Sequence, residues 1–150
     1  MLEAAGLRVG LQAEPIDLLA GRDWAAGPGA GAVLSFEGTT RDGPPGERVL
    51  RLEYEAYAAM AEPVLLALAT EAKARWGLER ALVLHRTGAV AVGEVSVLVV
   101  VAAAHRREAY AASAWLMDRL KAEAPIWKRE LTEQGAAWRA NAGAPPEELG

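Results

Sequence analysis

Alternation of hydrophobic and polar positions, with a period of two, predicts β-strands in several stretches of this chain. We expect strands over residues 7–12, 32–37, 50–57, 81–86, 95–101 and 126–131. In the third stretch Leu50, Leu52, Tyr54 and Ala56 form the apolar face. The stretch at 95–101 is nearly all apolar, so we expect it at the centre of a sheet, joined to the strand before it by a connector over 88–93.

Helical spacing of apolar residues marks two longer segments. One runs over about residues 60–76 and ends at Gly77, and the other runs over about 105–124 and ends before Pro125. A shorter helix is predicted over residues 14–19, with Pro15 in its first turn and Gly21 just past its end.

Glycine and proline mark the loops, at residues 25–31 and 38–46. We expect the second to be a mobile surface loop that carries Arg41. Trp138 is expected to anchor a final turn, and residues 141–150 to form a frayed tail. Because strands and helices are interspersed without regular βαβ alternation, the predicted class is α+β with a mixed or antiparallel sheet, in one domain over residues 1–150.

Composition narrows the class of protein. The chain has 150 residues, of which 52% are hydrophobic and 24% charged, which is enough apolar surface to exclude wholesale disorder. A net charge of -4 argues against nucleic-acid binding by bulk electrostatics, so we expect no nucleic-acid partner. The start lacks a secretory signal and no apolar run reaches the length of a membrane span, so we expect a cytoplasmic protein with no membrane partner.

The chain contains no cysteine, which excludes disulfides, a cysteine nucleophile, a thiolate metal site and a persulfide relay through this chain. The two histidines have no carboxylate or thiol partners at ligand spacing, so we expect no metal site. The glycine-rich run at 27–31 precedes a strand and matches no phosphate-loop or dinucleotide pattern. No cofactor is therefore expected.

Positive charge gathers near the end of the chain. Residues 105–129 carry six basic and three acidic residues, although the whole chain is acidic. Clustered like charges repel unless a ligand offsets them, so this segment indicates an anion pocket; the alternative is a solvated helix face. Lys121 leaves its helix at the edge of the apolar stripe, where its amine can act as base, nucleophile or proton donor, or lie as an ordinary surface lysine.

Both histidines have a predicted setting. His105 and Arg106 lie where the central strand turns into a helix, a place where unpaired N–H groups favour an anion or where the residues merely cap the helix. His85 lies inside a strand beside Arg86, and we interpret it as a packing or surface residue.

The residues around these positions carry a family resemblance. The runs HRREAY at 105–110 and MDRLKAEAPIWKRE at 117–130 resemble the molybdopterin synthase large (catalytic) subunit family, also called the MoaE family. The segments GAV at 31–33, GTTR at 38–41 and LHRTG at 84–88 are similar to the same family in the same order. The resemblance covers residues from about 15 to about 141.

This resemblance implies an α/β-hammerhead fold and a sulfurtransferase that acts in molybdenum cofactor biosynthesis. It implies a homodimer at the centre of a heterotetramer, with a small ubiquitin-like sulfur-carrier subunit at each end. The carrier's C-terminal Gly-Gly thiocarboxylate would transfer sulfur to cyclic pyranopterin monophosphate and form the molybdopterin dithiolene.

By position, the resemblance implies roles for individual residues. Lys121 and Lys128 match the catalytic lysines and also contact substrate. The other substrate-binding positions are Thr39, Thr40, Arg41, His105, Arg106, Arg129 and Glu130. Arg139 is the candidate for an arginine that reaches the neighbouring subunit's site. The alternative is a non-catalytic binding module for the tail of a ubiquitin-like protein, in which either lysine could be replaced by arginine with little loss.

Overall fold

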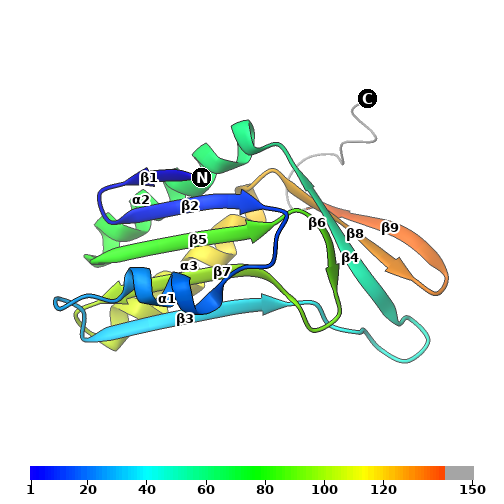
Figure 1. Ribbon diagram of the computed structural model, residues 1–150, viewed down its shortest axis with the longest axis horizontal. Coiled ribbons are helices and arrows are strands. Elements are labelled where there is room, and N and C mark those ends of the chain that lie inside the picture. Colours follow the sequence, from blue (N-terminus) through cyan, green and yellow to red (C-terminus); the bar gives the residue numbers. More distant parts are fainter. Residues whose placement is uncertain (141–150) are drawn as a thin grey trace.

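The computed structural model describes residues 1–140, which form three helices and nine strands (Figure 1). In chain order these are β1 Leu2–Ala4, β2 Leu7–Gln12, α1 Leu18–Ala25, β3 Ala32–Thr39, β4 Val49–Ala56, α2 Ala58–Trp76, β5 Arg80–Arg86, β6 Gly88–Ala91, β7 Val95–Ala103, α3 Arg106–Glu123, β8 Ile126–Thr132 and β9 Gly135–Ala140. The predicted tail at 141–150 lies outside the described residues. None of the helices in residues 1–140 is long and apolar enough to cross a membrane.

The strands form two sheets. The five-stranded sheet has the order β1-β2-β5-β7-β3, in which only β2 and β5 pair in parallel. The four-stranded sheet has the order β6-β4-β8-β9 and is antiparallel throughout. The predicted mixed α+β class is confirmed, and β7 lies between two neighbours as its apolar sequence predicts.

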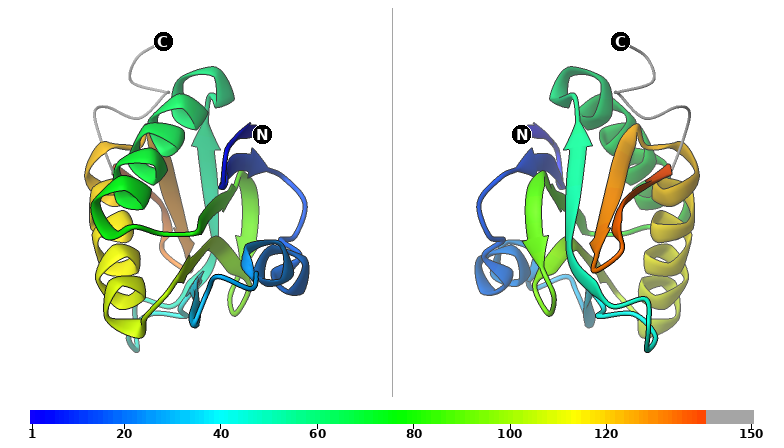
Figure 2. Two further views of the ribbon diagram at one scale, coloured as in Figure 1. Left: turned by 90° about the vertical axis from the view of Figure 1, so that its left-hand side faces the viewer. Right: turned by 90° about the vertical axis from the view of Figure 1, so that its right-hand side faces the viewer.

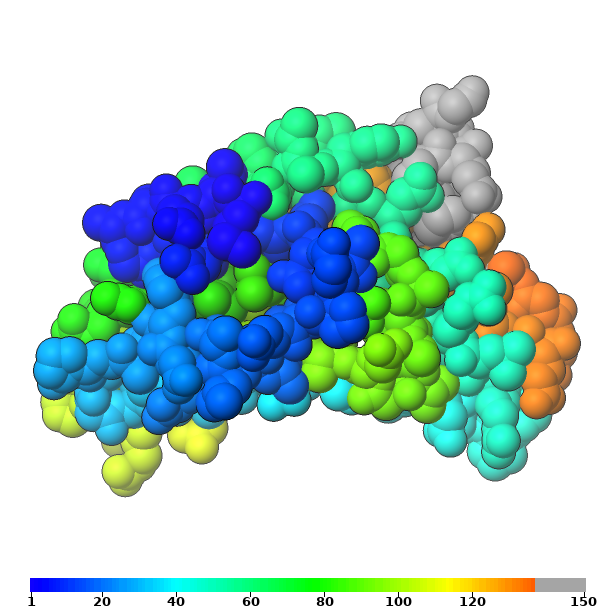
Figure 3. All heavy atoms as spheres, viewed as in Figure 1, coloured from blue at the N-terminus to red at the C-terminus, as the bar shows by residue number. Residues whose placement is uncertain are grey.

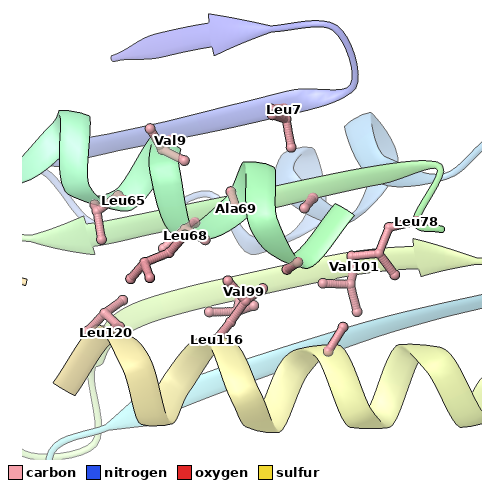
Figure 4. Packing of buried hydrophobic residues seen from close by; sticks show 14 of the residues in the cluster. Leu7, Val9, Leu65, Leu68, Ala69, Leu78, Val99, Val101, Leu116 and Leu120 are labelled. Carbon is pink, nitrogen blue, oxygen red and sulfur yellow. The ribbon is translucent and has the colours of Figure 1, made fainter. Parts of the chain in front are cut away.

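Helices cover both faces of the five-stranded sheet (Figure 2). Along β7, Val99 and Val101 pack under α2 and α3, where Leu116 of α3 meets them (Figure 4). The alternate residues Leu98 and Val100 pack on the opposite face, in the cluster beneath α1. Burial on both faces is the physical reason why this strand is almost wholly apolar.

The two long helices end where the sequence predicts. Gly77 follows α2 in the left-handed conformation, with φ of 62°, which a residue without a Cβ adopts at little cost. α3 begins after His105 and stops at Ala124, because the following Pro125 disfavours helical geometry in the residue before it.

The short first helix lies later than predicted. Asp17 caps it by accepting a hydrogen bond from the Ala20 N–H at 3.0 Å, so the helix starts at Leu18 and not at residue 14. Gly21 lies inside it, whereas the sequence pattern placed this glycine past its end. A Cβ at Gly21 would lie 2.8 Å from the Leu98 side chain, so glycine here lets the helix approach the sheet.

Four further expectations about strands are wrong. The connector over 88–93 contains β6, a short edge strand that pairs with β4. Leu50 is 51% exposed because the register of β4 shifts between Val49 and Arg51, which turns Leu50 off the apolar face. Trp138 lies in β9 and not in a turn. β3 also extends to Thr39, two residues beyond its predicted end.

Different segments of the chain lie at the two ends of the molecule. The connection between β3 and β4 and the β8–β9 hairpin lie together at one end, as the space-filling view shows in cyan-green and orange (Figure 3). The start of α3 lies at the other end (Figure 1). The four-stranded sheet therefore meets the five-stranded sheet near the C-terminal end of α3.

Candidate functional site

A cavity of about 720 Å³ opens where the two sheets meet the last turns of α3. Its walls come from the end of β3 and the loop after it, from β4, from the end of β5, from the start of β7, from α3 and from β8. The polar and charged residues that line it are Thr39, Arg41, Glu47, Tyr54, His85, Ser96, Lys121, Lys128, Glu130, Thr132 and Gln134.

Two of the chain's three lysines line this cavity. Lys121 reaches it from α3, one residue after the buried Leu120 that holds the helix on the core. Lys128 reaches it from β8, where its Cα lies opposite that of Tyr54 in β4. The third lysine, Lys73, belongs to α2 and is not part of the lining. The fold therefore brings together the two amines that lie seven positions apart in the sequence.

The alternation of β8 separates neighbouring residues that the resemblance treats alike. Lys128, Glu130 and Thr132 line the cavity, whereas Arg129 lies on the other face of the strand. There its Nη2 donates to Glu53 Oε2 at 2.5 Å. Hydrogen bonds from Arg129 and then from Arg51 lower the pKa of the Glu53 carboxyl. The structure does not bring Arg129 into the cavity.

The loop after β3 places two of its three predicted residues at the cavity. Thr39 and Arg41 are exposed and line it. Thr40 is buried between them and fixes the loop through its backbone: its N–H donates to Glu94 O at 3.1 Å, and its carbonyl accepts from Gly93 N–H at 2.8 Å. Thr40 thus positions the segment that carries Arg41.

His105 and Arg106 are not in this cavity. Both are exposed at the start of α3, where His105 is the N-cap residue by backbone position but makes no capping hydrogen bond with its side chain. At a rise of about 1.5 Å per residue, the 15 residues from Arg106 to Lys121 put about 22 Å of helix between them. Within one copy of the chain, these two residues and the cavity lysines cannot contact one small ligand.

His85 is a cavity residue that sequence reasoning missed. It is buried, its Nδ1 lies 2.7 Å from the carbonyl oxygen of Arg86, and its ring meets the Tyr54 ring edge-on at 4.8 Å. Burial, with a further contribution from the charge of Lys128, lowers the pKa of His85 to about 4. Of the packing and surface settings predicted for it, the packing setting is correct, but its place in the wall of the cavity depends on how the two sheets are assembled.

The charges of the cavity favour an anionic ligand. Arg41, Lys121 and Lys128 outnumber the acidic residues Glu47 and Glu130. Burial raises the pKa of the Tyr54 hydroxyl, so this side chain is neutral at pH 7 like His85. In residues 1–140 no three His, Asp or Glu side chains are grouped to hold a metal ion. The arrangement suits recognition of an anion, with amines placed for proton transfer.

Comparison with known proteins gives consistent matches. Residues 11–123 match the family described as MoaE protein. A molybdopterin synthase catalytic subunit of Arabidopsis thaliana is 43% identical over 126 residues, covering 84% of this chain but 64% of that protein, so the chain spans less than two thirds of this plant relative. One from Cereibacter sphaeroides is 43% identical over 146 residues, covering 96% of this chain and 99% of the relative.

A solved structure agrees with both sequence matches. The crystal structure titled molybdopterin synthase from Staphylococcus aureus superposes with a TM-score of 0.83 at 34% identity, and covers 87% of this chain and 96% of that chain. Fold, order of motifs and sequence identity all lead to one assignment: the chain belongs to the MoaE protein family.

Proposed function

We propose that this chain is the catalytic subunit of a molybdopterin synthase, a sulfurtransferase. It moves sulfur from the C-terminal Gly-Gly thiocarboxylate of a small ubiquitin-like carrier subunit to cyclic pyranopterin monophosphate, and so forms the molybdopterin dithiolene. The observation that carries the proposal is the pair of lysines from α3 and β8 that line one cavity together with Arg41. The names of the relatives support the same activity.

Charge explains how the cavity would assemble the reactants. A cyclic phosphate and a thiocarboxylate are both anions, and cationic side chains hold both in one small volume. Such proximity removes much of the entropic cost of a reaction between two molecules. Since the chain has no cysteine, the sulfur must arrive on a partner.

The two amines are assigned to proton transfer and to charge stabilisation. Attack by the thiocarboxylate sulfur forms a carbon–sulfur bond as a carbon–oxygen bond of the substrate breaks, and a neighbouring ammonium group stabilises the negative charge on the departing oxygen. Water then cleaves the acyl–sulfur bond, which leaves the sulfur on the pterin and returns the carrier's C-terminal carboxylate. A second amine supplies or removes the proton that the substrate exchanges. We assign these tasks to Lys121 and Lys128 jointly, with Thr39, Arg41 and Glu130 as substrate-binding residues of the same cavity.

The remaining predicted substrate contacts need a second copy of the chain. His105 and Arg106 lie too far from the cavity of their own copy, so we propose that they bind substrate in the cavity of a neighbour within a homodimer. Arg139 is proposed for the same role; its backbone lies in β9 opposite Lys128, and its side chain is outside the described part. With a carrier bound to each copy, the assembly is a heterotetramer.

We propose that the chain works as one domain in the cytoplasm, where reducing conditions protect a thiocarboxylate from oxidation. Arg129 and Thr40 act in this account by supporting β8 and the Arg41 loop. They are not proposed to touch substrate from the positions that the fold gives them.

The test is reconstitution with thiocarboxylated carrier and cyclic pyranopterin monophosphate, with dithiolene formation as the readout. Variants are Lys121→Ala and Lys121→Arg, with Lys73→Ala and Lys73→Arg as matched controls outside the cavity. We expect product from the wild type and both controls, and its loss in both Lys121 variants. Carrier binding without product from the wild type would contradict the enzyme and leave a binding module.

Sharing of the site between copies has its own test. Copies carrying Lys121→Ala are mixed with copies carrying Arg106→Ala, and the dimers are allowed to exchange. If the two residues serve one site from different copies, random mixing restores about a quarter of the sites. No recovery in a mixture shown to have exchanged would contradict the shared site.

A further inference from the structure

His85 lines the cavity, is only 4% exposed, and has no task in the proposed reaction. It stands at the end of β5, between the Tyr54 ring of β4 and Val97 of β7. Burying a histidine at this depth costs free energy because its polar ring atoms lose water, unless each of them finds a partner. The hydrogen-bond partners of the two ring nitrogens therefore indicate the role of this side chain.

One ring nitrogen is committed to the fold. Nδ1 lies 2.7 Å from the carbonyl oxygen of Arg86, and a carbonyl oxygen only accepts, so Nδ1 carries the proton and donates it. In the neutral ring Nε2 then holds a lone pair. Within residues 1–140 Nε2 has no hydrogen-bond partner, and because the Nδ1 edge is turned to the backbone, Nε2 is the atom left for a ligand in the cavity.

The surroundings keep this ring neutral. Cations dominate the cavity side, and burial together with Lys128 lowers the pKa of His85 to about 4. The charged and titratable groups on the elements around it are Arg41 and Glu47 of the loop between β3 and β4, Tyr54 of β4, Arg86 of β5, Glu94 before β7, Lys121 of α3, and Lys128 and Glu130 of β8. At pH 7 Nε2 is therefore a neutral acceptor in a cavity that otherwise holds cationic donors and the carboxylates Glu47 and Glu130.

We propose that His85 is a substrate-binding residue whose Nε2 accepts a hydrogen bond from a ring N–H of the pterin. This inference rests on the proposed function. The cations of the cavity recognise the phosphate and the thiocarboxylate, but they only donate, so the N–H groups of a pterin need acceptors, and Nε2 supplies one without adding negative charge to that of Glu47 and Glu130. A neutral acceptor on the cavity wall completes the recognition and selects for a heterocycle that presents a donor.

Two variants separate the two ring nitrogens. In His85→Asn the side-chain amide keeps a donor near the Nδ1 position and loses the acceptor near Nε2. In His85→Gln the longer side chain returns an acceptor near Nε2. Binding of cyclic pyranopterin monophosphate is measured directly, alongside KM and kcat, and a thermal melt of each variant shows that it is folded.

We expect His85→Asn to raise Kd and KM about tenfold, the loss of one hydrogen bond, while His85→Gln stays within about threefold of the wild type. Wild-type Kd should stay level from about pH 8 to about pH 5.5, because a neutral acceptor does not titrate in that range. Binding that tightens as the pH falls through about 6.5 would mean a protonated His85, and would overturn the proposal.

The result also separates this inference from the proposed function. Wild-type protein that binds the pterin, with equal affinity in the folded Asn variant, overturns the role of His85 and leaves the synthase standing. Wild-type protein that does not bind the pterin overturns both.

Discussion

The two faces of the β4–β8 strand pair carry similar charged residues, but these residues have different roles on each face. On the cavity face Lys128 and Glu130 point into a space of about 720 Å³, and in the described part of the chain neither is in an ion pair. On the outer face Arg129 is paired with Glu53. Three consecutive residues of β8 thus divide into two that are available to a ligand and one that holds two strands together.

A sequence motif alone therefore does not assign a role to each of its residues. A sequence match gives the same weight to every residue in the matching run, whereas alternate side chains of a strand point to opposite faces of the sheet. The residues that a partner already satisfies contribute to the fold. The polar residues that line a cavity without such a partner are those that can bind a ligand or react with it.

The largest expected effect contrasts the two faces directly. Lys128→Ala should lower kcat by about a hundredfold or more, because an amine that stabilises developing charge is lost. Arg129→Ala should leave kcat within about threefold of the wild type, since its side chain lies outside the cavity. Steady-state dithiolene formation at saturating carrier measures both. An Arg129→Ala variant that is folded and yet as inactive as Lys128→Ala would break the contrast.

The next effect in size is expected in the free energy of unfolding at acid pH, and it comes from His85 on the cavity face. His85 has a folded pKa of about 4 against 6.5 when unfolded, so the unfolded chain binds the extra proton between those values. Stability is therefore full above about pH 6.5 and falls as the pH drops toward 4, by about 3 kcal/mol in all. Urea melts of the wild type and of His85→Gln across this range measure it. Equal pH slopes for the two proteins would contradict the burial of a neutral histidine.

The Glu53–Arg129 ion pair on the outer face should lose its stabilising effect at a lower pH than His85 does, and the change in the free energy of unfolding should be smaller. The pKa of Glu53 is lowered by Arg129, so its contribution is present above the ordinary value of 4.5 and lost as the pH falls below it. Because the pair is partly exposed, Glu53→Gln should cost about 0.5–1 kcal/mol at pH 7 and less at about pH 3. Denaturant melts at the two pH values measure this. A cost that does not shrink in acid would show that the lost contact is not the ion pair.

The smallest change in kinetics is expected at Gln134. Gln134 of the β8–β9 turn donates to the carbonyl of Gly46 at 2.9 Å and ties the hairpin to the Arg41 loop. Gln134→Ala should raise KM about two- to threefold and leave kcat unchanged, because an exposed hydrogen bond contributes only about 0.5 kcal/mol. Initial-rate kinetics with varied pterin measure it, and a change in kcat alone would contradict a positioning role for this contact.

Periodicity predicted the long elements because each buries one face or both. α2, α3, β5, β7 and β8 follow the apolar pattern closely. The errors fall where pairing and not burial decides: β6 is an edge strand held by hydrogen bonds to β4, and Leu50 is displaced by a register shift. Gly21 was misread because its role, a close approach to Leu98, depends on a strand more than seventy residues away.

The site was predictable only in part for the same reason. Lys121, Lys128, Arg41, Thr39 and Glu130 were identified by resemblance, and the fold brings all of them to one cavity. His85 was not, since nothing local to β5 distinguishes a histidine at a cavity from one in a core. The resemblance also grouped His105 and Arg106 with the lysines, although the length of α3 keeps them apart within one copy.

In the proposed reaction the carrier's C-terminal tail meets the substrate in the cavity between the two sheets. The most direct measurement activates the carrier's C-terminal carboxylate with a carbodiimide in the complex and maps the resulting amide bond by mass spectrometry. The chain offers three lysines, and only Lys121 and Lys128 lie in the cavity. We expect a bond to one of these two lysines and none to Lys73. Coupling at Lys73, in a complex shown to be intact, would contradict it.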